Sequence, residues 1–272
     1  MARRDDPKSN RLLGALTDAD WRRWRPQLER VDLHLGQVLY EPGRPQFHAY
    51  FPTSAIASLL YLMDSGAASE VAVVGNEGLV GTSLFLGGRA TTSHGSVLIA
   101  GQGFRIAAQM IRDEFDRSDS VRLLLLRYTQ ALITQIAQTA VCNRHHAIDQ
   151  QVCGWLLHSM DRLRGNEVVV TQELLANMLG VRRESVTAAA GRLQAAGLIH
   201  YARGHIAVLD RAGLERQSCK CHAAVKKEYD RLLPQEPVAR VSNPPRRASP
   251  GWDGEAPVRL TRQHDVATVC EG

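Results

Sequence analysis

The spacing of hydrophobic positions changes along the chain. Residues 10–30 resemble a short helical entry, in which Thr17 or Asp18 could cap a helix. From about residue 31 to residue 106, apolar runs of four to seven residues alternate with turns that contain Gly or Pro. This texture predicts short strands folded into a β-barrel or a double-sheet roll, with a hairpin turn at residues 64–66.

Residues 118–142 have a helical pattern, with no Gly or Pro for 25 residues. The apolar stripe is wide enough for two partners, the predicted roll on one side and a second chain on the other. A core helix within a single chain is the alternative. The stripe consists of Val121, Leu124, Leu125, Tyr128, Leu132, Ile133, Ile136, Thr139 and Ala140.

Two further segments differ in kind. Residues 145–163 predict another amphipathic helix, which ends at the turn LRGNE. Residues 234–272 are rich in Pro, Ser, Gly and Arg and offer little surface for a core, so we expect a disordered tail.

The stretch TQELLANMLGVRRESVTAAAGRLQAAGLI, residues 171–199, predicts two helices around a glycine. Thr171 is suited to cap the first helix, and Gly180 can take the left-handed conformation that ends it. The second helix ends at Gly197. Its inward positions are Val186, Ala190 and Leu193. This order is a helix-turn-helix arrangement.

The start of the second helix carries side chains that can read base edges in a major groove. Arginine pairs bidentately with guanine, and glutamate accepts a hydrogen bond from cytosine. The candidates are Arg182, Arg183, Glu184, Ser185, Thr187 and, further along the helix, Arg192. For Arg192, a solvated surface role stays open.

The segment LIHYARGHIAVLD predicts a hairpin that turns at Arg203-Gly204 and would form a wing. His200, Arg203 and His205 could contact phosphates from this wing.

Together, these segments resemble the winged helix-turn-helix of the Crp/Fnr family of bacterial transcription regulators, most strongly over residues 170–215. The resemblance extends over about residues 10–230. It implies an α+β fold with a double-sheet, cyclic-nucleotide-binding-like β-roll, a long dimerisation helix and a Crp-type winged helix-turn-helix. The expected domains are 10–117 (roll), 118–142 (dimerisation helix), 143–233 (DNA-binding domain) and 234–272 (tail). The implied partners are double-stranded DNA with a two-fold symmetric operator, a second copy of the chain, and RNA polymerase.

Within the resemblance, Arg183 and Glu184 match the family's base-reading arginine and glutamate, and Ser185 matches a hydroxyl position that contacts DNA. Two positions depart from the family pattern. Ala188 stands where a second base-reading arginine is common, and Arg182 stands where Ser or Thr often caps the helix. The operator is therefore expected to differ from the family's best-known one.

The effector pocket departs further from members that bind cyclic AMP. Gly81 matches the glycine of their phosphate-binding cassette, but Thr82 replaces the glutamate. Thr92 and Ser93 stand near the phosphate position, and Arg89 is displaced by a few residues. Because a half-buried phosphate needs a charged or multi-donor partner, we expect no binding of cyclic AMP in the usual way. Another ligand, or none, stays open.

The cysteines exclude one mode of sensing known in the resembled family. Its iron–sulfur members use N-terminal cysteines, whereas no cysteine precedes Cys142 here. Two Cys/His groups remain, neither with paired C-x-x-C spacing, so no metal or cofactor is predicted. A metal or redox role for either group stays open. The groups are Cys142, His145 and His146, and Cys219, Cys221 and His222.

Charge and composition fit this interpretation. Residues 31–117 carry 5 basic and 8 acidic groups, net −3, whereas residues 142–233 carry 13 and 9, net +4. A polyanion partner is thus expected for the C-terminal part, with a mildly basic surface as the alternative. The odd number of scattered cysteines, the lack of an apolar run of about 18 residues and the absence of a secretory signal predict a cytoplasmic protein without membrane spans.

The motifs argue against an enzyme. We find no nucleophile elbow with a Ser-His-Asp order, no phosphate loop and no paired carboxylates on a suitable framework. The alternative to a DNA-binding regulator is a ligand or redox sensor that acts through a protein partner and keeps a vestigial DNA-binding domain. Ala188 keeps this alternative open, because it stands where the resembled family often has a second base-reading arginine.

Overall fold

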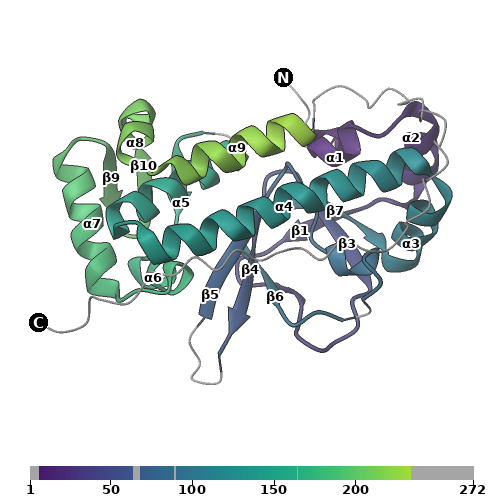
Figure 1. Ribbon diagram of the computed structural model, residues 1–272, viewed down its shortest axis with the longest axis horizontal. Coiled ribbons are helices and arrows are strands. Elements are labelled where there is room, and N and C mark those ends of the chain that lie inside the picture. Colours follow the sequence, from purple (N-terminus) through teal and green to yellow (C-terminus); the bar gives the residue numbers. More distant parts are fainter. Residues whose placement is uncertain (1–5, 64–67, 89, 164, 234–272) are drawn as a thin grey trace, which may run out of the picture. The chain divides into compact units, whose positions relative to one another are not determined.

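The computed structural model describes residues 6–63, 68–88, 90–163 and 165–233. The described chain begins with short helical segments beside the β-roll (Figure 1). Asn10 fixes this entry, because its side-chain oxygen caps α1 while its amide donates to the carbonyls of Pro52 and Gly78 at 2.9 and 2.7 Å. The segments are η1 (Pro7–Ser9), α1 (Arg11–Gly14), α2 (Asp18–Trp24) and η2 (Arg25–Gln27). Thr17 caps α2, as one of the two predicted alternatives.

The roll consists of two antiparallel sheets, with strand orders β1-β7-β3 and β2-β6-β4-β5. Buried and more exposed positions alternate along β3, so one face of the strand packs on the core. The strands are β1 (Glu29–Leu33), β2 (Val38–Tyr40), β3 (His48–Pro52), β4 (Ile56–Leu62), β5 (Ala68–Val74), β6 (His94–Ile99) and β7 (Gly101–Ala107), with η3 (Thr82–Leu84) before β6. The double-sheet roll is therefore confirmed, while the predicted turn at 64–66 lies outside the described residues.

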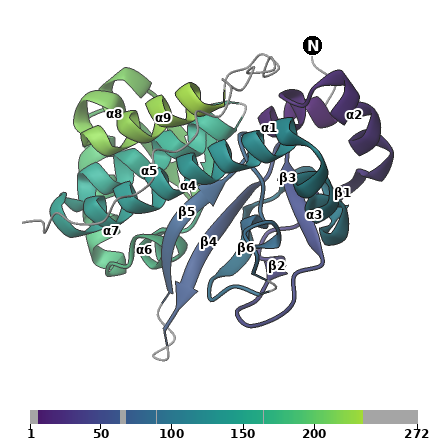
Figure 2. The same cartoon turned by 45° about the vertical axis from the view of Figure 1, so that its right-hand side comes forward.

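After α3 (Ala108–Arg117), the long helix α4 (Asp119–His145) crosses the roll (Figures 1 and 2). It begins after Ser118 and runs three residues past the expected end at residue 142. The side that faces the roll is buried and includes Leu125, Tyr128 and Leu132. The other side leaves large apolar side chains exposed, which are Leu126, Ile133 and Val141.

The predicted start of the next helix at residue 145 is wrong. His145 still belongs to α4, and His146 and Ala147 are extended before α5 (Ile148–Arg162) begins. The physical reason is local, because the Ala147 N–H is donated to the Gln150 side chain at 3.3 Å and so caps the new helix.

The C-terminal part holds the helix-turn-helix, its wing and two more helices. The wing has three strands in the order β8-β10-β9. Strand β8 was not predicted from the sequence, because it is short and has only one buried position. The elements are β8 (Glu167–Val169), α6 (Gln172–Leu179), α7 (Arg183–Ala195), β9 (Ile199–Ala202), β10 (His205–Val208), α8 (Arg211–Gln217) and α9 (Lys220–Leu232).

Two hydrophobic cores hold these parts together, and each takes side chains from both halves of the chain. Val225 and Tyr229 of α9 join the roll and α4 in one core. Ile56 and Leu60 of the roll join the helix-turn-helix and Trp155 of α5 in the other. Accordingly, α9 lies alongside α4 in both views (Figures 1 and 2). The predicted disordered tail, 234–272, lies outside the described residues, among which no helix is both long and apolar enough to cross a membrane.

Candidate functional site

The helix-turn-helix is built by local caps, as predicted. Thr171 Oγ1 accepts the Leu174 N–H at 3.1 Å and so begins α6. Gly180 has φ 64°, a left-handed conformation that glycine adopts at little cost, and it ends the helix. Arg182 is extended and begins α7 without a side-chain cap.

One face of α7 is anchored and the other is open. Val186, Ala190 and Leu193 are buried, as predicted, and Ala189 is buried with them. The opposite side faces solvent over Arg182, Arg183, Glu184, Thr187, Ala188, Gly191 and Arg192. Ser185 is half-buried between the two faces.

The cations at the start of α7 have no ionic partner within the described part of the chain. Arg182 and Arg183 form no ion pair or side-chain hydrogen bond there, and both are exposed. Their guanidiniums therefore need not break an existing pair in order to bind a phosphate or a guanine. Glu184 beside them is likewise exposed.

Thr187 and Arg192 are engaged within the protein. Thr187 Oγ1 lies 2.7 Å from Gln172 Oε1 and so links α7 to α6. The Arg192 guanidinium pairs bidentately with Asp149 of α5, at 2.7 and 2.5 Å, and its hydrogen bonds lower the pKa of the Asp149 carboxyl. The Arg192 side chain lies on the helix surface, as in the alternative that the sequence left open, and there it is paired with Asp149 rather than only solvated.

The wing turns at the predicted position. Arg203 and Gly204 both have positive φ, 51° and 80°, which is typical of a tight hairpin turn. Arg203 and His205 are exposed at the tip, and His200 is exposed on β9. The Tyr201 hydroxyl donates to the Val170 carbonyl at 2.9 Å and ties the wing to the start of the helix-turn-helix.

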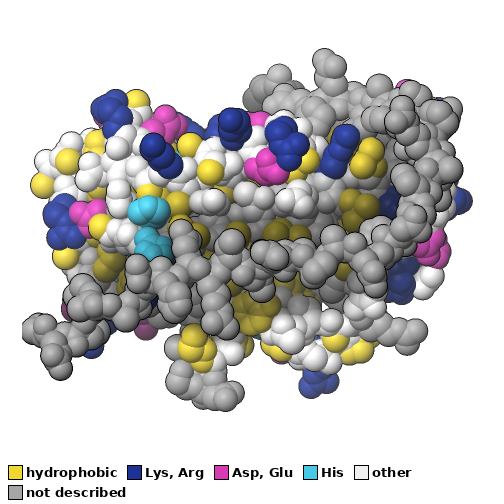
Figure 3. Space-filling view, in the orientation of Figure 1, with side chains coloured by type: hydrophobic (Ala, Val, Ile, Leu, Met, Phe, Trp, Pro, Cys, Tyr) yellow, Lys and Arg dark blue, Asp and Glu magenta, His cyan; other side chains and the backbone are white. Residues whose placement is uncertain are grey.

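Lys and Arg side chains also gather along α9, as well as at the α7 end of the protein (Figure 3). Two of the α9 cations differ from Arg182 and Arg183 because they are paired with acidic neighbours, whereas the exposed Lys220 and Lys227 form no ion pair among the described residues. Lys226 pairs with Asp230 at 2.6 Å, and Arg231 pairs with Glu228 at 2.7 Å. The start of α7 is the better candidate for contact with a polyanion, because two adjacent arginines are exposed and unpaired there and stand at the open end of the second helix of the helix-turn-helix.

A cavity of about 210 Å³ lies in the roll where the effector pocket is expected. Gly81, Thr82 and Ser93 line it, whereas Thr92 is exposed and does not. Arg89 lies outside the described residues. No charged side chain is among the described residues that line the cavity.

The cavity wall also contains residues that were not predicted from the sequence to line it. Leu132 and Ile136 of α4 close one side, although their helical spacing had indicated only packing. Tyr40 also contributes, and its hydroxyl lies 3.0 Å from Ser93 Oγ. The long helix therefore touches the inside of the sensor domain.

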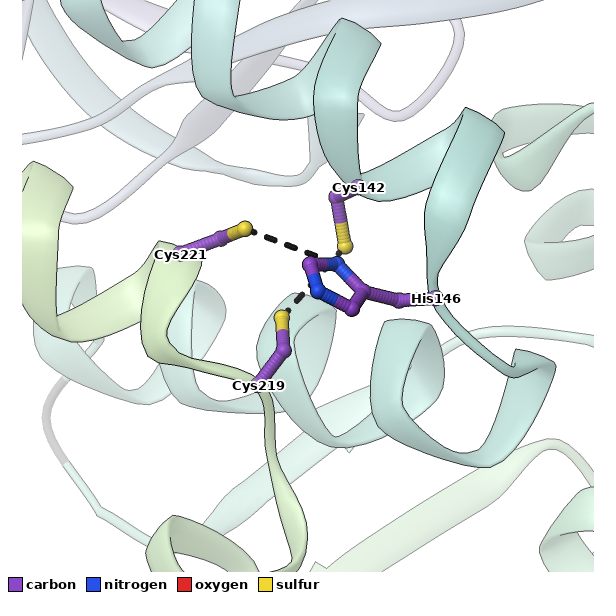
Figure 4. A group of neighbouring side chains, drawn as sticks. All are labelled: Cys142, His146, Cys219 and Cys221. Atoms are coloured by element: carbon purple, nitrogen blue, oxygen red, sulfur yellow. Dashed lines mark hydrogen bonds between the residues drawn. The ribbon is translucent and has the colours of Figure 1, made fainter.

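The structure brings together members of the two Cys/His groups. Cys142 and His146, at the end of α4, lie beside Cys219 and Cys221, at the start of α9 (Figure 4). His145 is exposed and is not part of this cluster.

Comparisons with known proteins agree with the architecture. Residues 150–217 match the family model of the Crp-like helix-turn-helix domain. A search of curated proteins found no match.

Solved structures share the fold over most of the chain, at low sequence identity. A putative Crp/Fnr-family transcriptional regulator from Eubacterium rectale is 19% identical, with a TM-score of 0.60, covering 76% of this chain and 96% of that one. FixK2 from Bradyrhizobium japonicum is 13% identical, with a TM-score of 0.60 and coverage of 71% and 98%. The c-di-GMP-responsive global regulator CLP from Xanthomonas campestris is 17% identical, with a TM-score of 0.56 and coverage of 71% and 100%.

At these identities the likenesses show a shared fold, over 71–76% of this chain. The chain therefore contains a Crp-like helix-turn-helix domain at residues 150–217 and shares the fold of solved Crp/Fnr-family transcription regulators.

Proposed function

We propose that this protein binds a two-fold symmetric DNA operator as a homodimer and reads it with the start of α7. The observation that carries the proposal is the pair Arg182 and Arg183. Both are exposed, neither has an ion pair among the described residues, and the helix beneath them is held by a buried face. In this arrangement Arg183 and Glu184 read bases, while Ser185 and Arg182 contact DNA beside them.

Further contacts would position the operator without reading its sequence. The helix start at Thr171 and the wing residues Arg203 and His205 are exposed and suited to phosphate contacts. We assign Arg192 a supporting role, since Asp149 already holds its guanidinium.

The homodimer is supported by the uncovered side of α4. Leu126 and Ile133 are seven residues apart and 44% and 55% exposed, and Ala140 follows at the same spacing. A seven-residue apolar repeat is the pattern of a two-helix coiled-coil seam. Two copies joined along α4 would place their recognition helices about 34 Å apart, one turn of DNA.

We place control of DNA binding in the roll. A ligand in its cavity would touch Leu132 and Ile136 and so change the packing of α4, which leads to the DNA-binding domain. Such a ligand would shift the population between two arrangements of the dimer. The uncharged lining argues against cyclic AMP in its usual mode, because the cyclic phosphate would find no cation among the described lining residues.

The domain roles follow the expected division. We assign residues 10–117 to sensing, 118–142 to dimerisation and 143–233 to DNA binding, with no catalytic role. RNA polymerase is the proposed protein partner on DNA, and the cytoplasm is the proposed location. A sensor that acts only through another protein is the second candidate, favoured by the exposed Ala188 in place of a base-reading arginine.

Selection of the purified protein on random duplex DNA, with and without cyclic AMP, tests the proposal. We expect a two-fold symmetric site that is enriched equally in both conditions. A site that appears only with cyclic AMP would overturn the interpretation of the cavity. Selection of no sequence in either condition, by a protein shown to be folded, would favour the second candidate.

A further inference from the structure

Three thiols and one imidazole converge at the junction between α4 and α9. Cys142 Sγ lies 3.5 Å from Cys219 Sγ, and Cys221 Sγ lies 3.6 Å from His146 Nδ1. One potential ligand atom from each of the four residues, an Sγ or an imidazole nitrogen, lies within 4.8 Å of the other three. Figure 4 shows the side chains pointing toward a common centre, two from the end of α4 and two from the start of α9.

The separations fit the edges of a small tetrahedron. With Zn–S and Zn–N bonds of about 2.3 and 2.0–2.1 Å, tetrahedral geometry places two sulfurs about 3.8 Å apart, and a sulfur and a nitrogen about 3.6 Å apart. Two contacts of the cluster, Cys142–Cys219 and Cys221–His146, already match these values to within a few tenths of an ångström, and every other separation is at most 4.8 Å. An iron–sulfur cluster fits less well, since its ligands bind different iron atoms and must lie further apart.

We propose that Cys142, His146, Cys219 and Cys221 bind one Zn²⁺ ion as a structural Cys₃His site. The chemistry balances without an oxidant or a reductant. Zn²⁺ displaces three thiol protons to solvent, the neutral imidazole binds through Nδ1, and the site carries a net charge of −1.

The surroundings suit a cation with thiolate ligands. Cys219 occupies the N-cap position of α9 and Cys221 lies in the first turn, where the helix dipole stabilises negative charge. A divalent ion would add to this stabilisation, because it neutralises the thiolates it binds.

A buried glutamine holds two of the proposed ligands in place. Gln151 Nε2 donates to the His146 carbonyl at 2.9 Å and to the Cys142 carbonyl at 3.5 Å. The turn between α4 and α5 is therefore pinned before any ion binds. Cys219 and Cys221 are buried, while Cys142 and His146 are half-buried, so the site is sheltered but can be reached from solvent.

Such an ion would join the sensor to the DNA-binding part of the protein. It would tie the last turn of α4 and the extended His146 that follows it to the start of α9. Both helices contribute to the core that includes the roll. Zinc would thus hold the end of α4 against the start of α9. This role does not depend on whether DNA is bound.

Metal analysis of the full chain, purified under reducing conditions with zinc supplied, tests this inference. We expect about one zinc per chain, retained through gel filtration, and, after exchange for Co²⁺, the visible spectrum of a tetrahedral cobalt thiolate. Cys219→Ser and His146→Asn should weaken zinc binding at least tenfold in competition with a chelator. The matched controls Cys270→Ser and His145→Asn should bind zinc like the unaltered chain.

Circular dichroism reports whether each variant is folded. If the ligand variants fail to fold, the cobalt spectrum of the unaltered chain decides the question. A spectrum without thiolate-to-cobalt charge transfer would overturn the proposal. So would a reduced, folded chain that retains no zinc, or ligand variants that bind zinc as tightly as the controls. A Cys142–Cys219 disulfide found by mass spectrometry, in a chain that binds no zinc when reduced, would replace the metal site with a redox pair.

Discussion

Arg162 of α5 donates from Nε to Glu77 of the roll at 2.8 Å, and both side chains are more than nine-tenths buried. The pair lies between the DNA-binding part and the sensor. Gln135 of α4 extends it, because its Oε1 accepts from Arg162 at 3.2 Å and from the Tyr229 hydroxyl of α9 at 3.0 Å. One buried polar network therefore connects the roll, α4, α5 and α9.

Arg162→Met should lower the free energy of unfolding by about 3–5 kcal/mol, because it leaves the Glu77 carboxylate buried without its partner. Urea denaturation measures the change. The double variant R162M/E77Q should lose less than the sum of its single variants, since the pair acts as a unit. Arg216→Met, which breaks an exposed ion pair with Asp210, is the matched control and should change little. Equal losses from Arg162→Met and the control would contradict a buried ion pair.

Arg183→Ala should weaken binding to the selected operator by about 1–3 kcal/mol and relax selectivity at one base pair, because a bidentate contact to a base is lost. Fluorescence anisotropy with the operator and its single-base variants measures both effects. Arg192→Ala is the control from the same helix, and it should leave base selectivity unchanged because Asp149 holds that side chain. Unchanged selectivity in Arg183→Ala would show that α7 is not the base-reading helix.

Ile133→Glu should convert the dimer to a monomer, because it places a charge in the centre of the uncovered side of α4. Sedimentation equilibrium gives the mass directly. Leu35→Glu is a comparable change at an exposed leucine of the roll and should leave the mass unchanged. A dimer that survives Ile133→Glu would place the interface elsewhere.

Glu70→Gln should change how stability depends on pH. Burial raises the pKa of Glu70 to about 7, although hydrogen bonds from Ser58 and Trp155 and the charge of Arg162 lower it. Between pH 4.5 and 7 the unfolded chain releases this proton while the folded chain keeps it. The free energy of unfolding therefore falls as the pH rises through this window, by on the order of 3 kcal/mol.

Glutamine does not ionise, so the free energy of unfolding of Glu70→Gln should not fall in this window. The difference between the variant and the unaltered chain should therefore grow in favour of the variant from pH 5 to pH 7 and stay constant at higher pH. Urea denaturation at pH 5, 6, 7 and 8 measures this difference. Glu173→Gln, at an exposed glutamate of α6, serves as the reference and should follow the unaltered chain. Parallel stability curves for Glu70→Gln and the unaltered chain would mean that Glu70 is ionised in the folded state.

Some features were predictable from the sequence because neighbouring residues determine them. The caps at Thr171 and Gly180, the buried stripe of α7 and the turn at Arg203 depend on contacts within a few residues. The predicted start of a helix at residue 145 was wrong for a local reason. The sequence pattern does not mark a break at His145-His146, and only the backbone shows that α4 ends there. The missed strand β8 is too short for a period of two to be recognised.

By itself, the sequence determined the roll, the long helix, the helix-turn-helix and the candidate base-reading residues, since period, capping and turn chemistry are local properties. Only the tertiary structure decided that Arg192 is held by Asp149, that Arg162 meets Glu77, and that α4 lines the sensor cavity. Only the tertiary structure also joined Cys142 and Cys219, which are 77 residues apart. Such contacts depend on how helices pack against each other and against the sheets, and no spacing within a single segment encodes that packing.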